Sequence, residues 1–135
     1  MAEYKGKLFK GLFTRAKNVL FDDDTCPFDF SETEQIDGTW LGETRYRKTI
    51  NFGVLPNNTT KAVNHNISNL KNIVDIRGIA WRSDGATNTL PTASVLNQTY
   101  NINVFAGSTT VSVQTAYDYS NFTNSYITIR YTKTS

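Results

Sequence analysis

The sequence predicts an all-β domain, either an antiparallel β-sandwich of jelly-roll type or a small barrel, and three observations favour it. From Thr44 onward, apolar and polar residues alternate with a period of two, which places successive side chains on opposite faces of a strand. β-Branched and aromatic residues, which suit a pleated surface, are frequent in these segments. Gly, Pro, Asn and Asp separate the segments at short intervals, without helical periods between them, and this favours antiparallel pairing.

Five segments show the alternation most clearly, and we expect each to form a strand: 44–52, 73–81, 100–106, 109–115 and 126–132. Gly107-Ser108 joins the third segment to the fourth, which predicts a tight hairpin. Gly78 is expected to mark a bulge. The breaker-rich stretch from residue 84 to residue 91 is expected to form a projecting loop, a kind of segment that often carries recognition.

The last segment divides into an apolar side and a polar side. Ile127, Ile129 and Tyr131 fall on the side that we expect to join the core. The opposite side consists of Thr128, Arg130 and Thr132. We expect the fold to close on this strand.

Composition changes near Trp40, so we divide the chain into an N-terminal attachment segment (1–39) and a β-sandwich domain (40–135). The attachment segment begins with a basic block and continues with an acidic one. An apolar stripe at helical spacing runs through the basic block and includes Leu8, Phe9, Leu12 and Phe13. The stripe fits an amphipathic helix that docks onto a protein partner, although two glycines leave short strands as the alternative.

The charge and the rarity of metal-binding side chains restrict the function further. Fourteen Lys and Arg against 12 Asp and Glu give a formal net charge of only +2, so we expect no nucleic-acid partner. The apolar runs are far shorter than a membrane-spanning helix, so we expect no membrane insertion. A single cysteine and a single histidine exclude an intrachain disulfide and a Cys/His zinc cluster, and we expect neither metal nor cofactor.

No arrangement of nucleophile, base and orienting group is recognisable in the sequence, which therefore predicts no enzyme and no catalytic residue. His65 is interpreted as a polar residue that enters a strand or turn, and Cys26 as a passive thiol. Asp22-Asp23-Asp24 is interpreted as a solvated acidic turn and not as a calcium loop. A small hydrolase that pairs His65 with a carboxylate is the weakest alternative.

Two groups of residues combine aromatic rings with polar side chains near expected turns, and we predict a glycan site there. The candidate residues are Trp81, Arg82, Asp84, Tyr117, Asp118 and Tyr119. Flat rings cover the apolar faces of a sugar, while Asp and Arg form hydrogen bonds with its hydroxyls. Ordinary packing in the core or at a subunit interface is the alternative interpretation.

Several sequence blocks resemble a module of bacteriophage and prophage virion proteins. The blocks are GTW at 38–40, YRKTINFG at 46–53, LPNNTT at 55–60, HNI at 65–67, IRGIA at 76–80 and YITIRYTK at 126–133. In that family the module is a small β-sandwich near the end of tail-fibre, baseplate or head-fibre polypeptides, often expected to form trimers and without known catalytic residues. The resemblance thus implies a noncatalytic virion structural protein that forms a homotrimer and is located in the virion.

This chain differs from that pattern because a short segment precedes the module in place of a long fibre shaft. The arrangement suits an anchor joined to an outward-facing knob, with a capsid decoration, a head fibre and a short tail component all left open. We expect the segment before Trp40 to bind other virion proteins and the knob to contact host surface glycans. The alternative is a stand-alone carbohydrate-binding module that acts without a particle.

Overall fold

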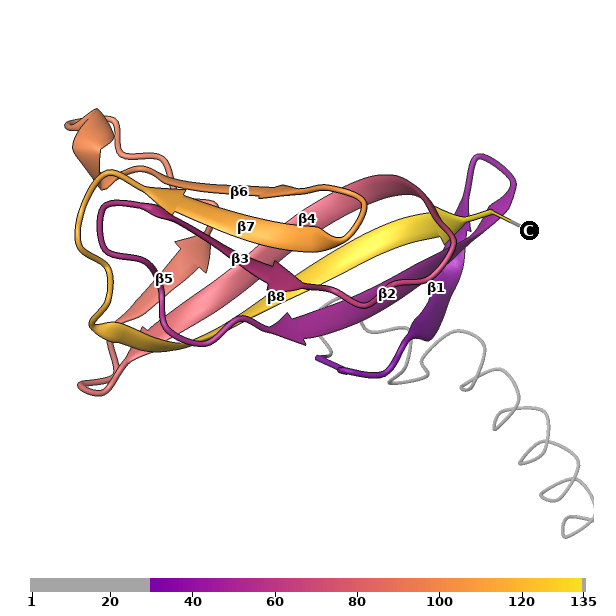
Figure 1. Cartoon of the computed structure of the whole chain (residues 1–135), viewed down its shortest axis with the longest axis horizontal. Coiled ribbons are helices and arrows are strands. Elements are labelled where there is room, and N and C mark those ends of the chain that lie inside the picture. Colours follow the sequence, from indigo (N-terminus) through magenta and orange to yellow (C-terminus); the bar gives the residue numbers. More distant parts are fainter. Residues whose placement is uncertain (1–29, 135) are drawn as a thin grey trace, which may run out of the picture.

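Two antiparallel sheets, packed face to face, form the part of the chain that the computed structural model describes, residues 30–134 (Figure 1). The larger sheet has the strand order β1-β2-β8-β4-β5, and the smaller has the order β3-β7-β6. The strands are β1 (Gln35–Trp40), β2 (Glu43–Asn51), β3 (Thr60–Asn64), β4 (Leu70–Arg82), β5 (Thr87–Leu90), β6 (Ile102–Ala106), β7 (Thr110–Thr115) and β8 (Phe122–Lys133). A short 3₁₀ helix, η2 (Gln98–Tyr100), lies between β5 and β6. The predicted all-β sandwich is confirmed.

Strand β8 lies at the centre of the larger sheet, paired with β2 on one side and β4 on the other. Its alternation divides it as the sequence predicts: Ile127, Ile129 and Tyr131 are fully buried in the core between the sheets. The smaller sheet supplies Val111 and Val113 to the same core. Full burial of each such side chain contributes about 1.5–3 kcal/mol, so this layer dominates the stability of the sandwich.

The change in composition places the domain boundary at Trp40, but the first strand of the larger sheet begins earlier in the chain. Strand β1 pairs with β2 from Gln35 onward, so the end of the expected attachment segment belongs to the sheet. The predicted helical stripe at Leu8, Phe9, Leu12 and Phe13, the acidic turn at 22–24 and Cys26 lie outside the described residues. No helix among residues 30–134 is long and apolar enough to cross a membrane.

The expectation of a bulge at Gly78 is wrong. The ladder between β4 and β8 is irregular at other positions, and Gly78 pairs in register with Ile127. A Cβ atom at this position would lie 2.4 Å from the backbone oxygen of Tyr126. Glycine is required here because the two strands approach each other closely.

The expectation of one open loop over residues 84–91 is also wrong, because strand β5 occupies half of it and pairs with β4. Asp84 makes a tight turn possible: its Oδ1 accepts a hydrogen bond from the backbone N–H of Ala86 at 3.0 Å. Gly85, with φ of +88°, adopts the left-handed conformation that completes the turn. After the turn, residues 87–90 run antiparallel to β4 as strand β5. Their alternation of polar and apolar residues suits a strand at the edge of the sheet.

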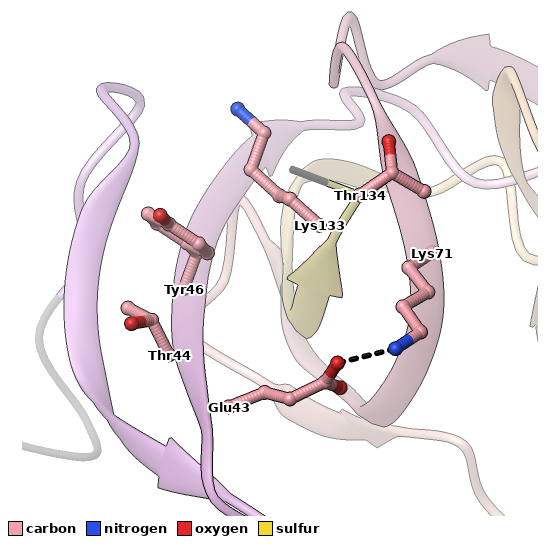
Figure 2. A pocket seen from close by; sticks show the side chains of 6 residues that line it. All are labelled: Glu43, Thr44, Tyr46, Lys71, Lys133 and Thr134. Carbon is pink, nitrogen blue, oxygen red and sulfur yellow. Dashed lines mark hydrogen bonds and ion pairs between the residues drawn. The ribbon is translucent and has the colours of Figure 1, made fainter.

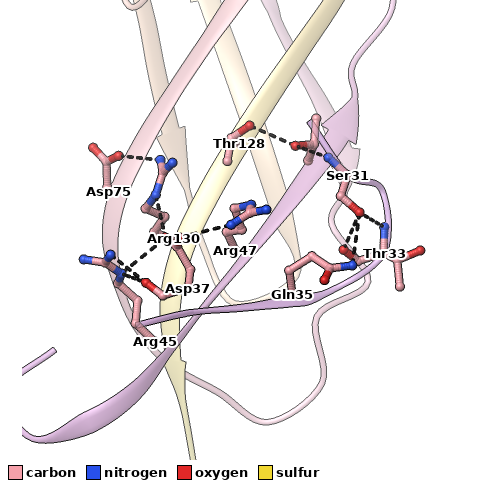
Figure 3. Close-up of polar contacts among 10 residues, drawn as sticks. Ser31, Thr33, Gln35, Asp37, Arg45, Arg47, Asp75, Thr128 and Arg130 are labelled. Carbon is pink, nitrogen blue, oxygen red and sulfur yellow. Dashed lines mark hydrogen bonds and ion pairs between the residues drawn. The ribbon is translucent and has the colours of Figure 1, made fainter. Parts of the chain in front are cut away.

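The face of the larger sheet that points away from the smaller sheet is here called the outer face. Strand β8 contributes its polar side to this face, as the sequence predicts, but these side chains are buried. Thr128 forms a hydrogen bond with Thr49 of β2 at 2.9 Å between the two hydroxyl oxygens. Arg47 and Arg130 lie beside this pair and bind Asp37 of β1 (Figure 3). The outer face therefore carries a second, polar layer in addition to the apolar core.

Candidate functional site

Four aromatic rings follow one another at one end of the sandwich, and we call Tyr100, Tyr117, Tyr119 and Phe122 the aromatic row. Ring centroids lie 4.9 Å apart for Tyr100 and Tyr117, and 5.5 Å apart for Tyr117 and Tyr119. Tyr119 continues to Phe122 at 5.8 Å. The connection from β7 to β8, which carries Tyr117 and Tyr119, lies at the end where β4 turns into β5, on the left in Figure 1.

Short-range polar contacts fix the segments that carry the aromatic row. Asn97 accepts a hydrogen bond from the backbone N–H of Thr99 at 2.9 Å and so starts the 3₁₀ helix that ends in Tyr100. The hydroxyl of Tyr119 donates to the backbone oxygen of Tyr100 at 2.7 Å. Asp118 accepts hydrogen bonds from the backbone N–H and the hydroxyl of Ser120 at 2.9 and 2.6 Å. These bonds hold the rings on a defined backbone.

The aromatic row is half buried and half exposed. Tyr119 and Phe122 belong to the core, whereas Tyr100 and Tyr117 remain 42% and 46% exposed. The edge-to-face contact between the two exposed rings keeps them in fixed orientations. Rigid, accessible rings of this kind can cover the apolar face of a ring-shaped ligand such as a sugar.

Charged groups lie beside the buried end of the row. The guanidinium carbon of Arg82 lies 5.7 Å from the ring centroid of Phe122, a cation–π contact. Arg82 also donates to both carboxylate oxygens of Asp84, with Nε to Oδ1 at 3.1 Å. This guanidinium, together with the backbone N–H of Ala86, lowers the pKa of Asp84 to about 2. Hydrogen bonds from Ser120 likewise lower the pKa of Asp118, so both carboxylates are ionised acceptors at neutral pH.

Of the six residues proposed for glycan binding, five belong to this end of the sandwich: Arg82, Asp84, Tyr117, Asp118 and Tyr119. Trp81 does not, because its side chain lies on the outer face. There its ring contacts Tyr126 edge to face at 6.1 Å, and Tyr126 stacks on Phe30 at 6.0 Å. Trp81 and Arg82 are neighbours in sequence, but the register of β4 against β8 shifts between them. Their side chains therefore lie in different surroundings.

Sequence reasoning missed Tyr100 as a site residue. The sequence predicts it as the first residue of a strand, whereas the strand begins at Ile102 and Tyr100 ends the preceding 3₁₀ helix. A local signal existed in Asn97, a residue that often caps helical turns. The proximity of Tyr100 to Tyr117 depends on tertiary packing and has no local signal.

The ring of His65 forms hydrogen bonds with main-chain groups. It is buried, its Nε2 lies 3.1 Å from the backbone oxygen of Gly107, and its Nδ1 accepts from the N–H of Ile67 at 3.1 Å. With Nε2 protonated, both ring nitrogens are satisfied by main-chain groups. The ring thereby joins the end of β3 to the turn between β6 and β7.

A cleft of about 380 Å³ lies near the opposite end of the larger sheet (Figure 2). It is lined by Glu43, Thr44, Tyr46, Lys71, Lys133 and Thr134. Lys71 forms an ion pair with Glu43, and Lys133 binds both carboxylate oxygens of Glu34 at 3.0 and 3.1 Å. The Lys133 ammonium also lies 5.4 Å from the ring centroid of Tyr46. Tyr46 is the one aromatic ring in this lining and already contacts the Lys133 ammonium, so the cleft combines rings with polar groups less well than the aromatic row does.

A second cavity, of about 360 Å³, opens on the outer face. Its lining is mainly apolar and consists of Phe30, Arg77, Gly78, Ile79, Thr89, Leu90 and Thr128.

Within residues 30–134, no group of three or more His, Cys, Asp or Glu side chains gathers in a way that could hold a metal ion. The aromatic row with its flanking charges thus remains the candidate site that best combines exposed rings with polar groups.

The fold and the site together define a β-sandwich with an aromatic, charged end. Comparisons of this chain with protein-family models, with curated proteins and with solved structures give no match.

Proposed function

We propose that this chain is a noncatalytic bacteriophage virion structural protein whose β-sandwich is a homotrimeric knob that contacts host surface glycans. The observation that carries the glycan contact is the pair of exposed rings, Tyr100 and Tyr117, held in place by the buried half of the aromatic row. The role in a virion rests on the resemblance of the blocks between residues 38 and 133 to phage fibre modules.

The chemistry of the aromatic end suits a weak sugar site. Each exposed ring can cover one apolar face of a pyranose, and Arg82, Asp84 and Asp118 supply donors and acceptors for hydroxyls. A single site of this kind gives modest affinity. Three copies displayed on one knob raise the overall avidity by about 10²–10⁴-fold without any new contact, which is why fibre proteins repeat weak sites.

Exposed apolar side chains support self-association. Ile36 and Leu41 on and beside the edge strand β1 are 63% and 88% exposed, and Val95 and Leu96 in the loop after β5 are almost fully exposed. Neighbouring apolar side chains left in water, such as Val95 and Leu96, are the kind of surface that an interface between subunits covers. We expect some of these groups to be covered in the homotrimer.

The same exposed rings also favour the alternative of a stand-alone carbohydrate-binding module. The two functions differ in assembly, because only the virion knob needs three copies and a particle. Native mass measurement of the purified full chain at micromolar concentration separates them. A trimer supports the knob, and a stable monomer supports the stand-alone module.

The glycan contact is tested by Tyr117→Ala in the full chain. The variant removes one exposed ring of the site. Truncation of one aromatic contact residue to alanine typically weakens binding by about 10-fold, or roughly 1–2 kcal/mol, and we expect a loss of that size. Binding is measured on an array of bacterial surface glycans and then by titration of the best ligand. Phe105→Ala is the matched control, because Phe105 on β6 is equally exposed, at 46%, but lies outside the aromatic row.

Two outcomes contradict the glycan contact. One is that the full chain binds no glycan on the array. The other is that Tyr117→Ala and Phe105→Ala, both shown by thermal unfolding to be folded, leave the affinity equally unchanged.

A further inference from the structure

The face of the smaller sheet that points away from the core consists of uncharged side chains, and we call it the neutral face. Lys61 of β3, Val113 of β7 and Val104 of β6 lie opposite one another in the ladder. Val113 is fully buried in the core, so this row of side chains points inward. The rows on either side of it point the other way, because successive side chains of a strand alternate. These two rows are Thr60, Gln114 and Asn103, and Ala62, Ser112 and Phe105.

Lys61 is the one charged residue in the three strands of the smaller sheet, all of which the structure describes. Its ammonium donates hydrogen bonds to the backbone oxygens of Phe52 at 2.9 Å and Val54 at 2.7 Å. The same ammonium lies 4.8 Å from the centroid of the Phe52 ring. These contacts hold the charge at the connection between β2 and β3, on the core side of the sheet. Lys61 therefore adds no charge to the neutral face.

The exposed charges of the described chain lie elsewhere. Arg45, Asp75 and Arg77 present guanidinium and carboxylate groups on the outer face of the larger sheet. Asp84 and Asp118 lie at the end of the sandwich that carries the aromatic row. Every residue between these two aspartates is uncharged, and this stretch forms β5, β6 and β7. The sandwich is thus charged on one broad face and neutral on the other.

A neutral face suits contact between identical copies. Where copies of one chain meet around a rotation axis, equivalent residues approach one another, so a charged side chain near the axis meets the same charge. Like charges that face each other across an interface oppose association. A different protein could supply the opposite charge, but an identical copy cannot do so near the axis. Uncharged polar groups also lose less hydration energy than charged groups when an interface covers them. The distribution of charge therefore favours a second copy of this chain as the partner of the neutral face.

The loop after β5 extends the neutral surface (Figure 1). It leads into β6, an edge strand of the smaller sheet, and its side chains Val95 and Leu96 are 97% and 95% exposed. The backbone N–H of Ser94 donates to Oδ1 of Asn101 at 2.7 Å, which ties the two ends of the loop together. A standard interface takes about 800 Å² and about 20–30 residues from each partner, more than three short strands supply. The loop provides the additional, apolar part of such an interface.

We propose that copies of this chain pack against one another through the neutral face, around a threefold axis, with Val95 and Leu96 covered at the margin of the contact. This inference rests on the proposed homotrimer and names the face that the homotrimer buries. The outer face of the larger sheet, with its exposed charges, then remains in water. With the threefold axis along the sandwich, the three aromatic rows lie at one end of the trimer, where all of them can contact the same host surface.

Isosteric substitutions test the contact. Asn103→Asp/Gln114→Glu adds two negative charges to the neutral face, at exposed positions that lie opposite each other on β6 and β7. The oligomeric state of the full chain is measured by native mass spectrometry and by sedimentation over a range of concentrations. We expect the unmodified chain to be a trimer, and the concentration at which half of it dissociates to rise at least about 10-fold in the variant. Salt at 1 M, which shortens the screening length to about 3 Å, is expected to reverse most of this rise.

The matched control is Asn72→Asp/Asn124→Asp, which adds the same two charges to the larger sheet. Both positions are exposed, and their partners in the ladder, Thr132 and Trp81, place them on the outer face. Because this face stays in water in the proposed trimer, we expect the control variant to dissociate at the same concentration as the unmodified chain.

A variant of opposite sign tests whether the neutral face meets its own copy. Asn103→Lys/Gln114→Lys is expected to dissociate like the acidic variant when it is alone. Mixing the two variants is expected to restore part of the oligomer, because opposite charges then meet across the contact. Recovery on mixing also shows that both variants are folded.

The outcomes distinguish this inference from the homotrimer on which it rests. A stable monomer of the unmodified chain at micromolar concentration would overturn both. An unmodified trimer together with an acidic variant that dissociates at the same concentration would overturn the neutral-face contact alone. Equal weakening by the acidic variant and the control would also overturn it, since the effect would then come from net charge. So would a mixture of the two neutral-face variants that stays monomeric although each variant unfolds cooperatively on heating.

Discussion

Replacing Asp37 by Asn removes the charge on which the polar layer of the outer face depends. The substitution keeps the shape of the side chain and one acceptor oxygen. It leaves Arg47 and Arg130, both with almost fully buried side chains, beside a neutral amide. Strand β1 then loses its ionic connection to β2 and to β8.

The expected cost follows from the burial of the pair. Removal of one partner from a buried ion pair typically destabilises a protein by about 3–5 kcal/mol, because the remaining charge stays in a medium of low polarity. The amide oxygen of Asn retains part of the hydrogen bonding, so we expect about 3 kcal/mol. For urea slopes of about 1–3 kcal/mol per molar, the unfolding midpoint falls by about 1–3 M.

The assay is equilibrium unfolding of the full chain in urea, followed by tryptophan fluorescence and by far-ultraviolet circular dichroism. Asp75→Asn is the matched control, because Asp75, like Asp37, binds Arg130, but its side chain is 29% exposed. Exposure and solvent screening limit its expected cost to about 1 kcal/mol. Equal midpoints for Asp37→Asn and the unmodified chain would refute the central role of Asp37, as would a larger effect of Asp75→Asn.

Two further changes test the core and the pH dependence. Gly78→Ala is expected to destabilise the sandwich by about 2 kcal/mol in the same urea assay, because its Cβ would meet the Tyr126 backbone oxygen; a change under about 0.5 kcal/mol would contradict this close approach. Burial raises the pKa of Glu34, but hydrogen bonds from Tyr131 and Lys133 outweigh it and lower the pKa below the ordinary value of 4.5. Its contribution to stability is therefore complete above pH 4.5 and is lost as the pH falls further, so thermal melting from pH 6 to pH 3 should decline more steeply for the unmodified chain than for Glu34→Gln; parallel declines would contradict the pairing.

Much of the sandwich could be predicted from local pattern. The alternation at 126–132 correctly places Ile127, Ile129 and Tyr131 in the core, because strand period alone decides which side chains share a face. The hairpin at Gly107-Ser108 follows equally from local turn chemistry, and its two strands pair as expected.

The remaining features depend on contacts between distant segments. Alternation assigns Arg130 to the polar side but does not reveal its burial, which requires Asp37, 93 residues away in the sequence, to lie beside it. Tyr100 and Tyr117 meet because β6 and β7 pair, and neither position identifies the other locally. Trp81 and Arg82 are neighbours in sequence yet lie in different surroundings, since the pairing with β8 shifts between them.

Proteomic mass spectrometry of gradient-purified phage particles from the strain that carries this reading frame tests whether the chain is a displayed part of a virion. We expect the chain to copurify with the major capsid or tail proteins at a copy number divisible by three. Its absence from infectious particles, together with its recovery as a free protein in the same lysate, would contradict the virion role.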